Sequence, residues 1–109
     1  MTAGVRETAV PGRTVVTVRA LQRLATGLAG EAAQVPAGDV SVRLTDADGS
    51  LRVAVTVPIS LGGDDTIVER GDGVRARVRE GMLRLGDREV RSVDVRFAGV
   101  RRPPERRVR

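Results

Sequence analysis

Apolar residues recur at three- and four-residue steps over two stretches of the chain, which is the spacing of one face of an amphipathic helix. The first stretch follows Thr17, a suitable N-cap residue, and stops at Pro36 and Gly38. The second follows the loop 62–65 and stops at Gly86. The predicted core positions are Leu21, Leu24, Ala25, Leu28, Ala32 and Val35 in the first helix, and Ile67, Gly71, Val74, Val78, Met82 and Leu85 in the second. Gly71 and Gly73 flank Asp72 and are residues at which the second helix could kink or split.

Strict alternation of apolar and polar residues predicts three further elements as strands, over residues 40–45, 51–57 and 93–97. A short strand is predicted over residues 14–16. The first two alternating segments are joined by Asp46-Ala47-Asp48-Gly49-Ser50, in which Asp-Gly supplies the positive φ of a tight hairpin. We therefore predict a β-hairpin between the two helices, with one apolar and one polar face.

This order of elements predicts an α+β fold, a two-layer βαββαβ-like sandwich in which two helices cover one face of a small sheet. The other face is expected to be open to solvent and to carry Ser41, Arg43, Thr45, Arg52, Ala54, Thr56, Asp94 and Arg96. We interpret residues 1–12 as a disordered leader, 13–100 as the folded domain, and 101–109 as an arginine-rich disordered tail.

Composition narrows the chemistry that this domain is able to perform. Its 109 residues include no His, Cys, Lys, Tyr or Trp, and Phe97 is the single aromatic residue. The nucleophile and metal sites that depend on His or Cys are therefore excluded, and we expect no cofactor, no metal and no disulfide. No apolar run has the length of a signal peptide or a membrane span, so we expect a soluble protein inside the cell.

The positive charge is concentrated at the C-terminus. Residues 1–100 hold fourteen arginines and thirteen acidic residues, a net charge of +1. The last nine residues hold one Glu and five arginines, namely Arg101, Arg102, Arg106, Arg107 and Arg109. Each arginine near an anionic membrane contributes about 1 kcal/mol, so this tail assists membrane contact without anchoring the protein. Weak, salt-dependent contact with nucleic acid and a purely solubilising role are the alternatives.

Three segments suggest a binding loop at first sight. Asp46 and Asp48 begin like a calcium loop, but the required Gly and Glu are not at the sixth and twelfth positions. The glycines at 62 and 63 precede a helix as in a phosphate-binding loop, but no Lys follows, and Asp64 and Asp65 would repel an anion. These two carboxylates have no third metal ligand near them in the sequence. We interpret all three as turn and helix-cap chemistry.

Two sets of arginines are candidate interaction surfaces. Arg43, Arg52 and Arg96 fall on the predicted open sheet face, which lacks the aromatic side chains on which RNA-binding sheets stack bases. Arg70, Arg77 and Arg84 form a stripe along the second helix, with Glu69, Asp72 and Glu80 nearby. Each set is either a solvated surface or a contact surface for another copy of the chain or an acidic partner.

The pattern also resembles that of the alkaline shock proteins, a family of small envelope-stress and general-stress proteins of Gram-positive bacteria. The resemblance covers residues 12–100 and rests on Gly12, Val16, Thr17, Ala20, Leu21, Leu24 and Ala25, on the strand 51–57 with Gly62 and Ile67, on Val74, Val78 and Gly86, and on Val93, Val95, Phe97, Gly99 and Val100. The chain departs from the family pattern at residues 35–40 and at Ser60-Leu61. The resemblance implies a non-enzymatic, self-associating protein, held at the cytoplasmic side of the membrane by a separate anchor protein.

We therefore hypothesise a non-catalytic protein of cell-envelope homeostasis that binds copies of itself and a membrane-anchor partner through edge strands and the open sheet face. The alternative is a small RNA- or ribosome-associated factor that uses the basic tail. A small enzyme that relies on carboxylates alone is the third class.

Overall fold

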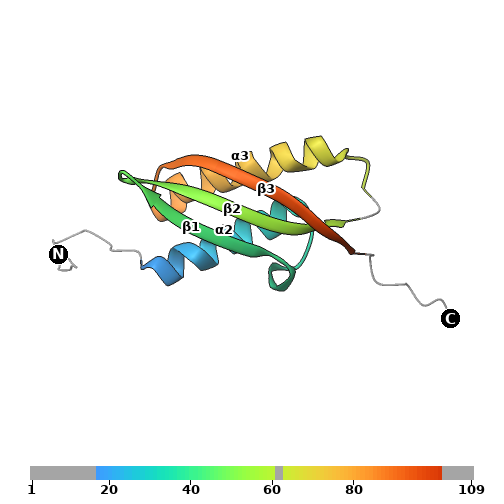
Figure 1. Cartoon of the computed structure of the whole chain (residues 1–109), viewed down its shortest axis with the longest axis horizontal. Coiled ribbons are helices and arrows are strands. Elements are labelled where there is room, and N and C mark those ends of the chain that lie inside the picture. The colour runs from blue at the N-terminus through green and yellow to red at the C-terminus, as the bar shows by residue number, and fades with distance from the viewer. Residues whose placement is uncertain (1–16, 61–62, 102–109) are drawn as a thin grey trace.

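The computed structural model describes residues 17–60 and 63–101. The predicted leader 1–12, the predicted strand 14–16 and residues 102–109 of the predicted tail lie outside these residues. In chain order the elements are α2 (Val18–Ala33), the short 3₁₀-helix η1 (Ala37–Asp39), β1 (Ser41–Ala47), β2 (Ser50–Ser60), α3 (Ile67–Gly86) and β3 (Val90–Arg101), as Figure 1 shows.

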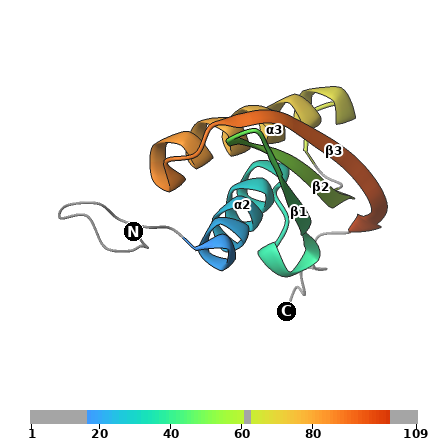
Figure 2. The same cartoon turned by 60° about the vertical axis from the view of Figure 1, so that its left-hand side comes forward.

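The predicted α+β fold is confirmed, with a three-stranded sheet in the order β1-β2-β3. β1 and β2 pair antiparallel, whereas β2 and β3 pair parallel. A parallel pair requires a long crossover connection, which α3 supplies. Both helices pack on the same face of the sheet, so that the molecule has two layers (Figure 2).

The hairpin between β1 and β2 is confirmed. Asp48 and Gly49 are its two turn residues, with φ values of 55° and 91°. Two consecutive positive φ values are those of a type I′ turn, whose twist matches that of the flanking strands. Ala47 pairs with Ser50 on either side of the turn, and the register continues to Ser41 opposite Thr56.

Side-chain caps define where both helices begin. The Thr17 hydroxyl accepts a hydrogen bond from the Ala20 amide at 3.0 Å, as predicted. α3 begins after a reciprocal capping box, in which Thr66 accepts from the Glu69 amide at 3.0 Å and the Glu69 carboxylate accepts from the Thr66 amide at 2.9 Å. α3 is one continuous helix from Ile67 to Gly86, so its glycines do not split it.

The core lies between the sheet and the two helices and consists of small and medium apolar side chains. Its members are Leu21, Ala25, Leu28, Ala29, Ala33, Val35, Leu51, Val53, Val55, Val57, Val74, Val78, Met82, Val90 and Val93. The predicted core residues Leu24 and Ala32 are only partly buried against this cluster. The predicted core residues Ile67 and Leu85 lie in the first and last turns of α3 and are 51% and 62% exposed, so their assignment to the core is wrong.

α2 and α3 run antiparallel and touch closely through glycine (Figure 1). A Cβ on Gly81 would lie 2.5 Å from Cδ1 of the buried Leu28, and a Cβ on Gly86 would lie 3.0 Å from Cδ2 of Leu21. A methyl group at Gly81 would overlap Leu28, and one at Gly86 would require the Leu21 side chain to shift by a few tenths of an ångström, so both glycines favour the close approach of the helices.

Gly73 and Gly81 occupy interior positions of the same helix in opposite environments, since a Cβ on Gly73 would meet nothing within 4 Å. Gly73→Ala should therefore raise the free energy of unfolding by about 0.5–1 kcal/mol, the helix-propensity difference. Gly81→Ala should instead lower it by about 1 kcal/mol, because overpacking against Leu28 exceeds the propensity gain. Urea denaturation of both variants checks the prediction, and two shifts of the same sign would contradict it.

Candidate interaction surfaces

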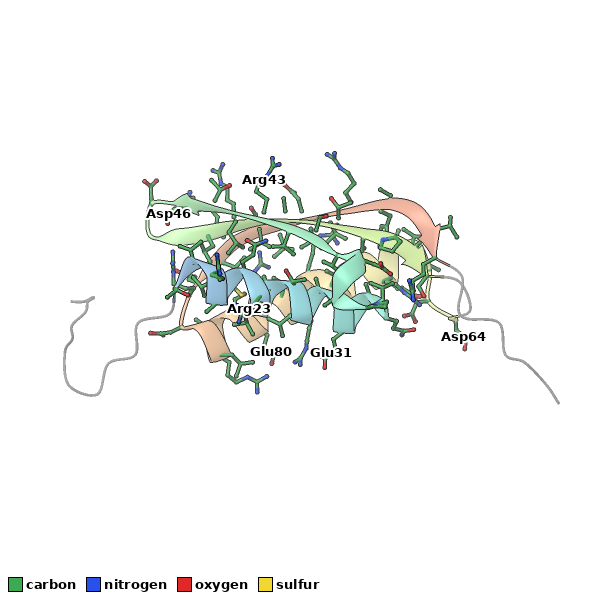
Figure 3. All side chains as sticks on the ribbon, turned by 90° about the horizontal axis from the view of Figure 1, so that it is seen from below. Arg23, Glu31, Arg43, Asp46, Asp64 and Glu80 are labelled. Atoms are coloured by element: carbon green, nitrogen blue, oxygen red, sulfur yellow. The ribbon has the colours of Figure 1, made fainter. Side chains whose placement is uncertain are left out.

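The face of the sheet opposite the helices carries a regular grid of polar side chains. Strand register sets three rows across β1, β2 and β3, and these rows are Thr45–Arg52–Ser92, Arg43–Ala54–Asp94 and Ser41–Thr56–Arg96. Figure 3 shows Arg43 pointing away from the helical layer, whereas Glu31 and Glu80 lie on the far side of that layer. The prediction that Arg43, Arg52 and Arg96 share the open face is confirmed.

The three arginines of the open face are available for intermolecular contact. All three residues are exposed, and within residues 17–60 and 63–101 none of them forms a salt bridge. Small side chains such as Ala54 and Thr56 lie between them and form the floor of a shallow groove of about 650 Å³. With Asp94 as the one acid in the grid, the face has a net charge of +2 and fits an acidic surface.

The predicted arginine stripe of α3 is a different kind of structure, because it faces α2. Arg70 is only 6% exposed, so the expectation that it belongs to an exposed interaction surface is wrong. Its Nη1 donates to the Ala33 carbonyl at 3.2 Å, and its Nη2 lies 3.6 Å from the Asp65 carboxylate. Ala33 ends α2, where carbonyls have no partner within the helix. Arg70 therefore serves as a C-terminal cap for α2.

The rest of the stripe is also engaged in ion pairs. Arg77 reaches across to α2 and donates twice to one oxygen of Glu31, at 2.6 and 2.9 Å. Arg84 is exposed and lies 3.6 Å from Glu80 on the same helix. Arg70 and Arg77 thus join α3 to α2. Of the three arginines, Arg84 is the one whose exposure suits an intermolecular contact.

The turn and helix-cap interpretations of the other segments agree with the structure. Gly63 is next to Arg70, since a Cβ there would clash with Nη2, so an internal guanidinium fills the space of the suggested phosphate loop. Asp46 lies 3.4 Å from Arg88 beside the hairpin. Arg101, which we assigned to the tail, is the last residue of β3 and pairs with Asp39. Arg102, Arg106, Arg107 and Arg109 lie outside the described residues.

The structure adds a feature that the sequence left unspecified, which is the outer edge of β3. This strand has twelve residues and, among residues 17–60 and 63–101, pairs only with β2 on its inner side. One flank of α3 runs along it: Arg79 donates to the Arg91 carbonyl at 3.2 Å, and Arg75 lines the same groove as residues 94–96. The pattern of residues 93–97 predicted a strand, but which strand lies at an edge depends on pairing, for which the sequence holds no local signal.

No protein-family model, curated protein or solved structure matches the chain. Among residues 17–60 and 63–101, no three acidic side chains gather as a metal site would require. Neither of the two long helices in this part of the chain is long and apolar enough to cross a membrane.

Proposed function

We propose that the chain is a non-catalytic interaction protein of the alkaline shock type, which acts in cell-envelope homeostasis by binding copies of itself and a membrane-anchor partner. The observation that carries the proposal is the open sheet face. It bears three exposed arginines without salt bridges in the described part of the chain, on a rigid sheet whose opposite face is occupied by the core. The resemblance over residues 12–100 supplies the biological setting.

Self-association is tested by sedimentation velocity of the full chain over a wide concentration range. The proposal expects a weight-average sedimentation coefficient that rises with concentration. A strictly monomeric protein at the highest concentration would contradict it. The same measurement at high salt shows how much of the association depends on exposed charges, because salt screens them.

Binding to an anchor is tested with inside-out membrane vesicles from a Gram-positive bacterium, before and after protease treatment of the vesicles. We expect the chain to sediment with untreated vesicles and to remain in the supernatant after proteolysis. Arg43→Gln/Arg52→Gln should weaken the binding, whereas Arg84→Gln on the helical layer should not. Equal retention after proteolysis would assign the binding to the lipid surface, and no retention at all would contradict the anchor.

The alternative RNA-associated function is favoured by the same arginines, which are also able to contact phosphates. It is disfavoured by Phe97, whose half-buried side chain packs against the core and not on the open face. We expect filter binding of a single-stranded RNA to be weak and to fall steeply with salt, as for contacts to phosphate alone. Tight binding at physiological salt that Arg43→Gln/Arg52→Gln/Arg96→Gln abolishes would favour the alternative.

A further inference from the structure

The outer edge of β3 is complementary in charge to a second copy of itself. Between two irregularities in its pairing with β2, residues 92–97 form a regular segment opposite residues 52–57. Asp94 and Arg96 lie on the open face of this segment, and Val93, Val95 and Phe97 lie on the core side. No strand of the described sheet pairs with this edge. An acid and a base two residues apart on it are able to pair with the base and the acid of a second copy after a two-fold rotation.

Among the registers that the geometry allows for residues 92–97, one places Asp94 and Arg96 opposite each other. Residues that are opposite each other in an antiparallel pair have side chains on the same face of the sheet. In a symmetric pair, the two-fold axis must therefore pass between two copies of the same residue. An axis at Asp94 or at Arg96 would place like charges directly opposite each other, which is destabilising. An axis at Val95 places Asp94 opposite the second copy's Arg96 twice, and Val93 opposite its Phe97 on the core side.

On the flank of α3 that runs along this edge, charged and apolar residues are also spaced evenly on both sides of a midpoint. Val68, Asp72, Arg79 and Leu83 lie on one side of the helix, and the midpoint of this series is next to Arg75. Arg75 lines the open-face groove together with residues 94–96, so its side chain reaches the edge of β3 beside Val95. The rotation brings Val68 toward Leu83 of the second copy, and these side chains are 72% and 58% exposed in the monomer. It also brings Asp72 toward Arg79 of the second copy, although within one copy Asp72 pairs with Arg75 at 2.7 Å and Arg79 donates to the Arg91 carbonyl.

We infer that two copies of the chain associate edge to edge through antiparallel β3 strands centred on Val95, which forms a continuous six-stranded sheet. This inference rests on the self-association in the proposed function and names its surface and register. The open faces of both copies lie on the same side of the joined sheet. The arginines Arg43, Arg52 and Arg96 of each copy then form one surface of twice the area for an acidic partner.

Charge reversal tests the register. Asp94→Arg should place the introduced guanidinium opposite Arg96 of the second copy, and Arg96→Asp should place the introduced carboxylate opposite Asp94 of the second copy. Each change replaces two attractive pairs with two repulsive ones, so the dimer dissociation constant should rise about tenfold or more in sedimentation equilibrium. Asp94→Arg/Arg96→Asp restores opposite charges in reversed order and should return the constant to near the wild-type value.

Arg52→Asp is the matched control, since it reverses an exposed charge on the central strand of the same face and should leave the dimer unchanged. Circular dichroism melting shows whether each variant folds. Single reversals without effect, a double reversal without rescue, or an equal effect of Arg52→Asp would overturn the inference while self-association stands. A wild-type chain that is monomeric throughout would overturn the proposed self-association as well.

A second test uses the lack of cysteine in the chain. Val95→Cys places two thiols across the axis, where mild oxidation should produce a covalent dimer on a non-reducing gel. Arg43→Cys, exposed on the opposite edge strand, should give little covalent dimer. Introducing Asp94→Arg into the Val95→Cys protein should reduce the cross-link. A cross-link that forms equally well with Arg43→Cys would contradict pairing through β3.

Discussion

Replacing Met82 with alanine is expected to lower the free energy of unfolding by about 2–5 kcal/mol, the range for large-to-small substitutions in a core. Met82 is fully buried and is among the largest side chains with no exposed surface. Most other core residues are Val, Ala and Leu, so few other buried side chains are as large as that of Met82. Denaturation by urea, followed by circular dichroism, measures the change.

The next residue of the same helix is the control. Leu83 is 58% exposed, so Leu83→Ala should change the unfolding free energy by no more than about 0.5 kcal/mol. A similar loss for both variants would mean that this turn of α3 is buried in another way, for example by association. Repeating the measurement at several protein concentrations separates a contribution from the dimer, because such a contribution depends on concentration.

Replacing Arg70 with methionine is expected to lower the free energy of unfolding by about 1–3 kcal/mol. Methionine keeps much of the apolar stem but leaves the buried Ala33 carbonyl at the end of α2 without its donor. Removal of a buried charge offsets part of this loss, and the partner Asp65 stays solvated because its side chain is 51% exposed. The net effect is therefore set mainly by the unsatisfied carbonyl.

Arg84→Met is the control from the same stripe. Arg84 pairs with Glu80 at 3.6 Å on an exposed surface, and such pairs contribute about 0.5 kcal/mol or less. Arg70→Lys should recover part of the loss, because one ammonium is able to reach the carbonyl but lacks the two-pronged geometry of a guanidinium. Equal destabilisation by Arg70→Met and Arg84→Met would contradict the assignment of Arg70 as a helix cap.

Local chemistry explains which parts of the fold were predictable. The hairpin follows from alternation on both sides of Asp48-Gly49, and the start of α2 follows from Thr17, because turns and caps depend on a few adjacent residues. The ends of β3 were not predictable in this way. The strand runs from Val90 to Arg101, well beyond the alternating residues 93–97, because pairing with β2 continues past irregularities at both ends.

The two candidate surfaces differ in the same way, since one was predictable from the local pattern and the other depends on packing between helices. Period-two alternation was sufficient to place Arg43, Arg52 and Arg96 on one face, since successive side chains of a strand point to opposite sides. The seven-residue spacing of Arg70, Arg77 and Arg84 was equally regular, but it did not show that this side of the helix faces α2. Whether a helical arginine is exposed or caps a neighbouring helix depends on where that neighbour lies.

Periodicity and turn chemistry within a few residues were sufficient to predict the two helices, the hairpin and the polar composition of the open sheet face. The parallel pairing of β3 with β2, the outer edge of β3 that stays unpaired within the described sheet, and the burial of Arg70 against α2 could be read only from the folded molecule. These features are set by contacts between residues far apart in the chain. A contact of that kind has no local pattern, so it appears only when the elements are packed together.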